Sequence, residues 1–302
     1  MKSSAININK PTFGKALSLK LKDVMELTKF RLSFLVVFSA VMAYLLAIQT
    51  SSVDFLKILF LSLGGFLITA SSNTINQIIE KDSDKLMDRT KNRPLASGRM
   101  KSMEACLIAG LSGVLGIFIL SIFFNTISGL LGALALISYA FIYTPFKKIS
   151  PTAVFIGAIP GSMPLLIGWT AATGSIGIGG LVLFAIQFFW QIPHFWAIAW
   201  LLNDDYKKGG YALLPGAEGK TRSVALQNIP YLLGLIGVSV LPYVLGISGK
   251  LSLAVSLIAG LFFLIQGIQL ATDLTDKSAR KLMFASFGYI PVVFISLVLD
   301  RI

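Results

Sequence analysis

Three oxygen-bearing side chains recur every fourth residue near the end of a long apolar stretch. They are Asn76, Glu80 and Asp84. If the stretch continues as a helix, each step of four residues rotates by about 40°, so the three side chains share one face over roughly 12 Å. Amide and carboxylate oxygens suit a hard cation such as Mg²⁺, which usually completes its shell with substrate phosphates and water. We therefore expect Asn76, Glu80 and Asp84 to act in catalysis and metal binding, with Asp88 extending the row.

Basic residues follow this acidic row directly. Arg89 and Arg93 stand four residues apart, and Lys91 lies between them. Arginine can bind phosphate oxygens through two parallel N–H donors. The order of acids and then bases predicts a clamp for a phosphorylated ligand, with Arg89 and Arg93 catalytic and Lys91 binding substrate. The alternative is a solvated loop with ordinary ion pairs, which explains the basic residues but not Asn76 and Glu80 at the end of an apolar helix.

A second acidic pair ends another apolar stretch. Asp204 and Asp205 occupy this position, and Lys207 follows them. Two acidic sites on one membrane face could hold metal ions on opposite sides of a diphosphate. We expect Asp204 and Asp205 to bind metal and substrate, and Lys207 to bind substrate. The alternative is a polar helix terminus before the Gly209-Gly210 turn.

The only histidine, His194, lies inside an apolar stretch. An ionisable group at membrane depth is a functional candidate by default. Pro193 removes a backbone donor beside it. His194 could ligate a metal, act as a base or bond a carbonyl structurally, and we treat it as a catalytic candidate. Trp196 belongs to a run of aromatic residues that could line a cavity for a large flat or polyisoprenoid ligand, or pack within the bundle or against lipid.

A phenol and an ammonium group come together near the end of a further apolar stretch. Tyr143 and Lys147 are therefore candidates for substrate binding, although membrane anchoring also explains the lysine. The stretch that follows contains Gly157, Gly161 and Gly168. Small residues there allow helices to approach closely.

The composition shows where these side chains must be placed. Of 302 residues, 55% are hydrophobic and only 13% are charged. The mean hydropathy is +0.79, which no single soluble core could hide, so we predict an all-α polytopic membrane protein. A span needs roughly 20 mostly apolar residues. Nine stretches meet this requirement, at about 31–49, 55–79, 104–123, 126–144, 152–171, 177–200, 229–247, 251–272 and 282–299.

The net charge of +12 is mainly a topology signal. With nine spans, 23 basic residues fall on one side of the membrane and 3 on the other. The positive-inside rule then places the N-terminus in the cytoplasm. Residues 1–24 are expected to form a cytoplasmic tail with a lead-in helix, and residues 25–302 the membrane domain. The dispersed basic residues argue against a nucleic-acid partner. The single cysteine, Cys106, is expected to be a buried structural thiol.

Taken together, these segments resemble the intramembrane prenyltransferase superfamily of the UbiA type, and most closely its heme-farnesylating branch. The resemblance covers about residues 25–300. Its broader part rests on Asn76-x3-Glu80-x3-Asp84 and on Arg89-Thr-Lys-Asn-Arg93-Pro-Leu. The heme branch is indicated by Pro193-His194-Phe-Trp196 and by Asp204-Asp205-Tyr206. The superfamily usually has aspartate at the position of Glu80 and a longer second aspartate row.

The resemblance implies a bundle of nine transmembrane helices around a central cavity, in a bacterial inner membrane. It implies farnesyl diphosphate and protoheme IX (heme b) as substrates, heme O as product, and Mg²⁺ as cofactor. It also implies a heme A synthase as a possible partner. His194 would then place the heme or hold the attacking water. Two alternatives stay open: a related prenyltransferase acting on a quinone-precursor aromatic acid or a chlorophyllide, and a membrane transporter.

Overall fold

The computed structural model describes residues 13–48, 53–216 and 219–302, and within these ranges every regular element is helical. Nine helical segments of the described chain are long and apolar enough to cross a membrane. The protein is therefore a multi-pass integral membrane protein. Its elements are α1 (Phe13–Leu27), α2 (Phe30–Ala47), α3 (Phe55–Leu86), α4 (Ser102–Phe123), α5 (Thr126–Ile137), a π-helical segment η1 (Ser138–Tyr143), α6 (Thr144–Phe146), α7 (Ala153–Thr173), α8 (Gly177–Leu201), α9 (Asn203–Lys208), α10 (Arg222–Leu226), α11 (Asn228–Val244), α12 (Lys250–Asp273) and α13 (Asp276–Leu299).

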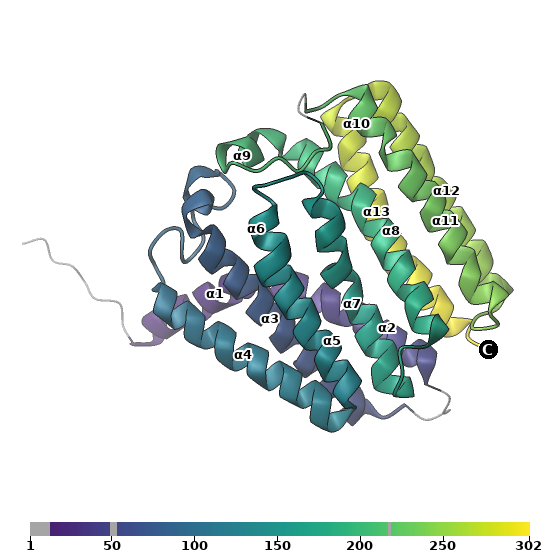
Figure 1. Cartoon of the computed structure of the whole chain (residues 1–302), viewed down its shortest axis with the longest axis horizontal. Coiled ribbons are helices and arrows are strands. Elements are labelled where there is room, and N and C mark those ends of the chain that lie inside the picture. Colours follow the sequence, from purple (N-terminus) through teal and green to yellow (C-terminus); the bar gives the residue numbers. More distant parts are fainter. Residues whose placement is uncertain (1–12, 49–52, 217–218) are drawn as a thin grey trace, which may run out of the picture.

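The spanning helices form two groups that lie side by side (Figure 1). In the first, α3 packs on α4, α4 on α5, and α5 on α7. In the second, α8, α11, α12 and α13 pack as a closed square. The groups are joined where α7 packs on α8, and by α2, which packs against α3 and α7 on one side and α13 on the other. The segments α6, α9 and α10 all lie at one end of the bundle (Figure 1).

The predicted spans are confirmed, most of them to within a few residues at each end. The largest difference is α3, which has 32 residues and extends to Leu86. Asp54 caps its N-terminus, since its carboxylate accepts hydrogen bonds from the amides of Leu56 and Lys57. The prediction for Cys106 is wrong, because its side chain is exposed on α4. An apolar surrounding sequence does not imply burial inside the protein when the outer face of a helix lies against lipid.

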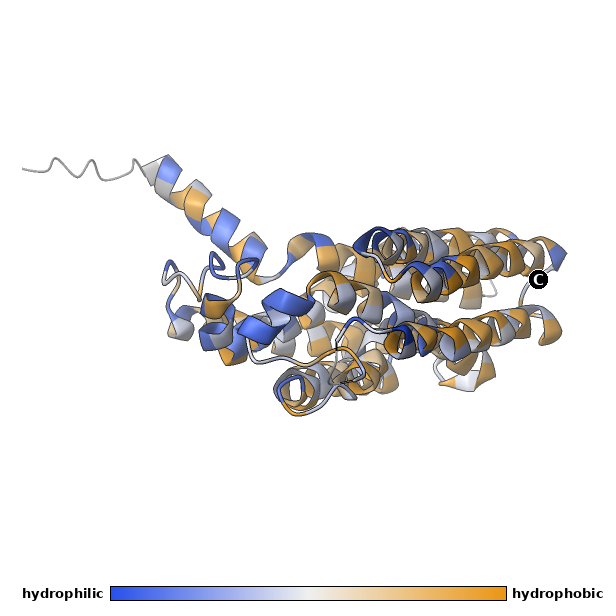
Figure 2. Ribbon diagram, turned by 90° about the horizontal axis from the view of Figure 1, so that it is seen from above, coloured by the Kyte–Doolittle hydropathy of each residue, from blue (hydrophilic) through white to orange (hydrophobic). Residues whose placement is uncertain are grey.

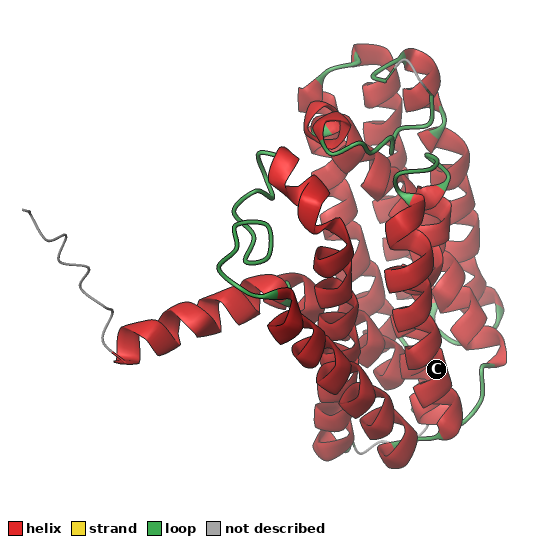
Figure 3. Cartoon of the chain, turned by 60° about the vertical axis from the view of Figure 1, so that its left-hand side comes forward, coloured by secondary structure: helices red, strands yellow, loops and turns green. Residues whose placement is uncertain are grey.

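Helix α1 extends away from the bundle (Figure 3). It carries alternating hydrophilic and hydrophobic residues (Figure 2), as expected for a lead-in helix. Arg99, in the loop after α3, holds this helix by contacting Asp23 at 2.9 Å and Glu26 at 3.0 Å. The rest of the predicted tail, residues 1–12, lies outside the described residues.

Glycine permits the close packing of α7 on α2. A Cβ atom added to Gly168 would overlap the backbone carbonyl of Ala40. Because backbone atoms cannot rotate aside, this contact fixes the separation of the two helices. A Cβ atom on Gly157 would meet the Tyr143 ring, and one on Gly161 would meet the Gln191 amide. The predicted role of these glycines in close packing is therefore confirmed.

Candidate active site

The polar row at the end of α3 faces the protein interior. Asn76, Glu80 and Asp84 are 1%, 5% and 1% exposed, and all three lie on the helix that was predicted to continue past the apolar stretch. The row ends at Asp84, because α3 ends at Leu86. Asp88 lies in the following loop and is exposed, so it does not extend the row as the sequence suggested.

Each buried carboxylate is paired with a cation from another segment. Arg93 donates to both oxygens of Asp84, with Nη1 at 2.9 Å from Oδ1 and 2.7 Å from Oδ2. Lys147, which follows α6, forms an ion pair with Glu80. All four side chains are at most 13% exposed. Buried charges are tolerated only when they are paired, so these four groups form one interdependent cluster.

The amide of Asn76 is oriented by its neighbours. Its nitrogen donates to the Thr144 hydroxyl at 3.0 Å, and that hydroxyl donates to the Tyr139 carbonyl at 2.9 Å. Tyr139 belongs to η1, and π-helical turns are frequent at functional sites. The Asn76 carbonyl oxygen is thereby left to accept from another group, one helical turn from Glu80.

The donor set fits Mg²⁺ in the mode that uses one or two protein carboxylates together with substrate phosphates. Asn76, Glu80 and Asp84 offer one amide oxygen and two carboxylates on one helix face. Over the described ranges, no group of three or more His, Cys, Asp or Glu side chains converges as a metal site. A cation here would therefore rely on ligand oxygens as well as on the protein.

Lys29 is a candidate site residue that the sequence analysis did not identify. It lies at the junction of α1 and α2 with a left-handed backbone, φ 48°. The Gln77 side chain holds this junction by donating to the carbonyls of Glu26 and Leu27, at 3.2 and 2.8 Å. A non-glycine residue in the left-handed region is strained, and such strain concentrates at functional sites.

The electrostatic environment of Lys29 connects it to the same cluster. Removal of its ammonium group from water, together with Arg93 and Lys147, lowers the pKa of Lys29 from 10.5 to about 7. Glu80 opposes this shift. Among the described residues Lys29 forms no ion pair, unlike Arg93 and Lys147. It is thus a cation available for an external anion.

Two tyrosines, Tyr206 and Tyr211, lie beside the basic residues of the cluster. The sequence analysis did not identify them as site residues. The Arg89 guanidinium lies 5.9 Å from the centre of the Tyr206 ring, and the Lys147 ammonium lies 5.5 Å from that of Tyr211. Burial raises the pKa of both phenols, so both hydroxyls keep their protons at neutral pH. The Tyr211 hydroxyl is buried and has no hydrogen-bond partner in the described chain. Tyr143, which was predicted, is buried and contacts Lys147 through its ring.

The side chain of Asp205, from the second acidic pair, is bonded to the backbone of the loop that follows α3. Asp205 accepts hydrogen bonds from the amides of Asp88, at 2.7 Å, and Arg89, at 3.3 Å. Asp88 also contacts Lys91 at 2.7 Å and Lys208 at 2.5 Å. These lysines hold the pKa of Asp88 at about 2. Asp204 and Lys207 are exposed on α9 at the same end of the bundle.

His194 lies deep in α8, away from the acidic cluster. Its Nδ1 is 2.7 Å from the Ser286 hydroxyl of α13. That hydroxyl donates its only proton to the Met283 carbonyl, at 2.5 Å. His194 must therefore donate from Nδ1, which leaves Nε2 with a lone pair. The ring stacks on Trp190 at 4.6 Å.

Trp196 is fully enclosed by packing. It is 2% exposed and packs edge-on against Phe155, at 5.8 Å, and Tyr231, at 5.4 Å. This contact explains its burial without a ligand. Its predicted substrate-binding role stays a prediction.

These contacts define a class of membrane protein: a polytopic helical bundle with a basic, carboxylate-containing site at one end. A model of the UbiA prenyltransferase family matches residues 36–290. The chain therefore belongs to the UbiA prenyltransferase family, and it is an enzyme of that kind.

Similar proteins narrow the class. A Cytophaga hutchinsonii protein named "Protoheme IX farnesyltransferase" is 47% identical, covering 92% of this chain and 96% of its own. A Christiangramia forsetii protein of the same name is 46% identical, covering 93% of this chain and 94% of its own.

Solved structures support the fold. A digeranylgeranylglyceryl phosphate synthase superposes with a TM-score of 0.76 at 22% identity, covering 93% of this chain and 98% of its own. A UbiA homologue from Archaeoglobus fulgidus, bound to GPP and Mg²⁺, gives 0.63 at 16% identity, covering 89% of this chain and all of its own.

Proposed function

We propose that this enzyme transfers the farnesyl group of farnesyl diphosphate to a vinyl group of protoheme IX and forms heme O. The relatives at 46–47% identity carry the name of this activity. The single observation that carries the proposal from the structure is the buried cluster of Glu80, Asp84, Arg93 and Lys147. It offers cations for a diphosphate beside carboxylates for a metal.

The diphosphate would be bound by Lys29, Arg89, Arg93 and Lys147. With Lys29 protonated, these four cations outnumber the carboxylates of Glu80 and Asp84, so the site attracts an anion. Mg²⁺, held by Asn76, Glu80 and Asp84, would supply further positive charge to the leaving group when bound. Asp204 and Asp205 are candidates for a second metal position, as in the sequence prediction. The Archaeoglobus fulgidus homologue was solved with GPP and Mg²⁺, which supports the use of Mg²⁺ with a prenyl diphosphate in this fold.

The reaction would begin when the carbon–oxygen bond of farnesyl diphosphate breaks and the diphosphate leaves with the electron pair. Arg93 and Lys147 neutralise the charge that develops on it. The terminal carbon of the heme vinyl group attacks the allylic cation, and water captures the resulting cation and loses a proton. The buried aromatic wall around Tyr143 and Tyr211 excludes water from the first cation.

His194 would orient the heme. Its Nε2 carries a lone pair and has no partner among the described residues, so it can ligate the heme iron or accept a proton from water. The stacked ring of Trp190 holds the imidazole in place. We expect the enzyme in a bacterial inner membrane, where a heme A synthase would be a consumer of the product.

The test is turnover by purified protein with Mg²⁺, farnesyl diphosphate and heme b, followed by mass spectrometry. The expected product is heme carrying a hydroxyl and a farnesyl group. Prenylation of 4-hydroxybenzoate but not heme would favour the alternative acceptor. Substrate uptake into vesicles without diphosphate release would favour transport.

Asp84→Asn should reduce turnover about 100-fold or more, because it removes the charge that pairs with Arg93 and would bind metal. Asp82→Asn is the matched control, since Asp82 is exposed and pairs only with Lys85. If Asp84→Asn turns over within a few-fold of the wild type, Asp84 has no role in the site.

A further inference from the structure

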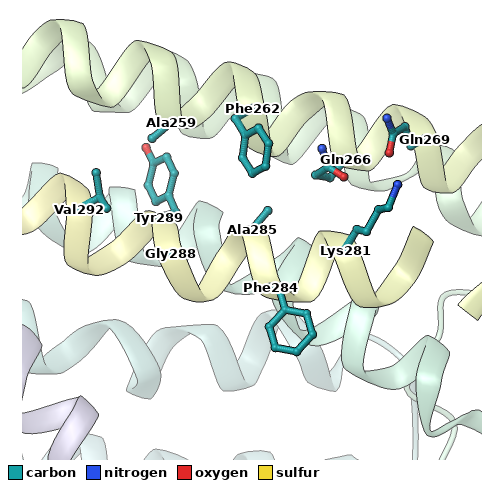
Figure 4. Close-up of a pocket in the computed structure, with 10 residues that line it drawn as sticks. All are labelled: Ala259, Phe262, Gln266, Gln269, Lys281, Phe284, Ala285, Gly288, Tyr289 and Val292. Atoms are coloured by element: carbon teal, nitrogen blue, oxygen red, sulfur yellow. The ribbon is translucent and has the colours of Figure 1, made fainter. Parts of the chain in front are cut away.

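A groove runs between α12 and α13, outside the site described above (Figure 4). Its volume is about 650 Å³. All of its lining residues come from these two helices, among them Phe262, Gln266, Gln269, Lys281, Gly288 and Val292. Phe262, Gly288 and Val292 are exposed, so the groove opens on the outer face of this four-helix square.

The groove is polar at one end only. Gln266, Gln269 and Lys281 lie together there, and the Lys281 amine points toward Gln269 (Figure 4). Gln266 is 7% exposed. The Gln269 amide oxygen is buried and lacks a partner within the described chain. The Gln269 oxygen can accept only from a donor such as the Lys281 ammonium, so the amide N–H groups of Gln266 and Gln269 are the donors that can meet a ligand oxygen here.

The same end carries positive charge. Lys281 forms no ion pair within the described ranges, Lys277 lies one turn earlier on α13, and Arg280 is the preceding residue. Of the acids at the adjoining helix ends, Asp276 is paired with Lys220 at 2.7 Å and Asp273 accepts from the Thr272 hydroxyl at 3.1 Å. The three basic residues outnumber these two acids. A ligand group at this end should therefore be anionic.

The remainder of the groove is apolar and has the length of one membrane leaflet. Lys281 and Val292 are separated by 11 helical positions, or about 17 Å at 1.5 Å per residue. Half the hydrocarbon thickness of a bilayer is about 15 Å. A second, apolar groove of about 390 Å³ begins at Val292 and continues to Leu299.

We propose that this groove binds one anionic phospholipid, with its phosphate on Lys281, Gln266 and Gln269 and an acyl chain along Gly288 and Val292. The depth of the polar end matches a headgroup, because Lys281 lies five residues inside the start of α13. The chemistry of the groove, a cation with two amides above an apolar channel, fits this ligand class. The proposal is independent of the reaction assigned to the enzyme.

The test is native mass spectrometry of the delipidated full chain with phosphatidylglycerol or phosphatidylcholine. Wild type should bind phosphatidylglycerol more tightly. Lys281→Gln should weaken that binding about fivefold, since one basic residue near a membrane surface contributes about 1 kcal/mol. Lys250→Gln, at the other end of α12, should not change it.

A second pair of variants tests the acyl channel. A side chain at Gly288 meets nothing within 4 Å, and the same is true of Gly110 on α4. Gly288→Leu should fill the groove and reduce binding of both lipids, whereas Gly110→Leu should not. Equal affinity for the two lipids, or equal binding by Gly288→Leu and Gly110→Leu, would refute the proposal. Displacement of the lipid by micromolar farnesyl diphosphate would identify the groove as a substrate site instead.

Discussion

At the residue scale, the carboxylates of the site already form ion pairs with cations of the protein itself. Asp84 and Glu80 are tied to Arg93 and Lys147. The anionic oxygens of a diphosphate would compete for the cation of each pair, and a bound metal ion would compete for the carboxylate. Removing one partner of a buried pair typically costs about 3–5 kcal/mol. Single substitutions here are therefore expected to affect stability as well as turnover, and their effects should be measured separately.

Lys29 predicts a pH dependence of diphosphate binding. With a pKa of about 7, its ammonium group is charged below pH 7 and loses its proton as the pH rises. The groups that act on it are Arg93, Lys147, Glu80 and Arg89. Bound diphosphate favours the protonated form, so the apparent KM for farnesyl diphosphate should rise by up to about tenfold per pH unit above 7.

Lys29→Arg should flatten this dependence, because guanidinium stays charged throughout the range. Lys22→Arg, on the exposed face of α1, should behave as wild type. Steady-state kinetics between pH 6.5 and 9 measure the effect. An unchanged pH profile in Lys29→Arg would exclude Lys29 as its source.

At the element scale, α8 and α13 together determine which nitrogen of His194 is free. The Ser286 hydroxyl on α13 sets the imidazole tautomer. The Trp190 indole of α8 donates to the Ser286 carbonyl at 2.8 Å, and this bond holds the two helices in register. His194 can therefore act only if this pair of helices stays docked.

Ser286→Ala removes the hydroxyl that fixes the proton on Nδ1 of His194. Heme binding should weaken by about tenfold, as is typical when the hydrogen-bond partner of a ligating histidine is lost. Ser296→Ala on the same helix is the control, because its hydroxyl donates only to Val293. Heme titration followed by the Soret band measures both, and His194→Ala should lose the ligand-dependent band shift. A normal spectrum and affinity for His194→Ala would show that the heme is held elsewhere.

The packing of α7 on α2 gives a second prediction at this scale. Gly168→Ala places a methyl group against the Ala40 carbonyl and should destabilise the protein by about 1–3 kcal/mol. Gly110→Ala meets nothing within 4 Å and should be neutral or stabilising by up to about 1 kcal/mol. Thermal unfolding in one detergent compares the two. Equal melting temperatures would mean that the helices separate without cost.

At the scale of the whole molecule, the asymmetry of charge predicts the orientation in the membrane. In a Cys106→Ala background, Asn92→Cys lies in the basic loop after α3 and Lys250→Cys at the opposite end of the bundle. An impermeant maleimide should label Lys250→Cys in intact cells and Asn92→Cys only after permeabilisation. The reverse labelling pattern would show that the protein has the opposite orientation in the membrane.

Prediction from the sequence succeeded where the relevant contacts are local. The face shared by Asn76, Glu80 and Asp84 follows from helical periodicity alone. It failed for Asp88, because the end of α3 is set by the loop that Asp205 holds from 117 residues away. It missed Lys29, because the turn that places this residue is held by Gln77, about 50 residues later.

The sequence alone determined the nine spans and the segments that carry the polar motifs, because a helix that crosses hydrocarbon must be long and apolar, and because basic residues show which loops share a side. Only the tertiary structure decided which cation pairs with which carboxylate, which nitrogen of His194 is free, and that α12 and α13 leave a groove. These features depend on side chains from different helices, and their distances are set by how the helices pack.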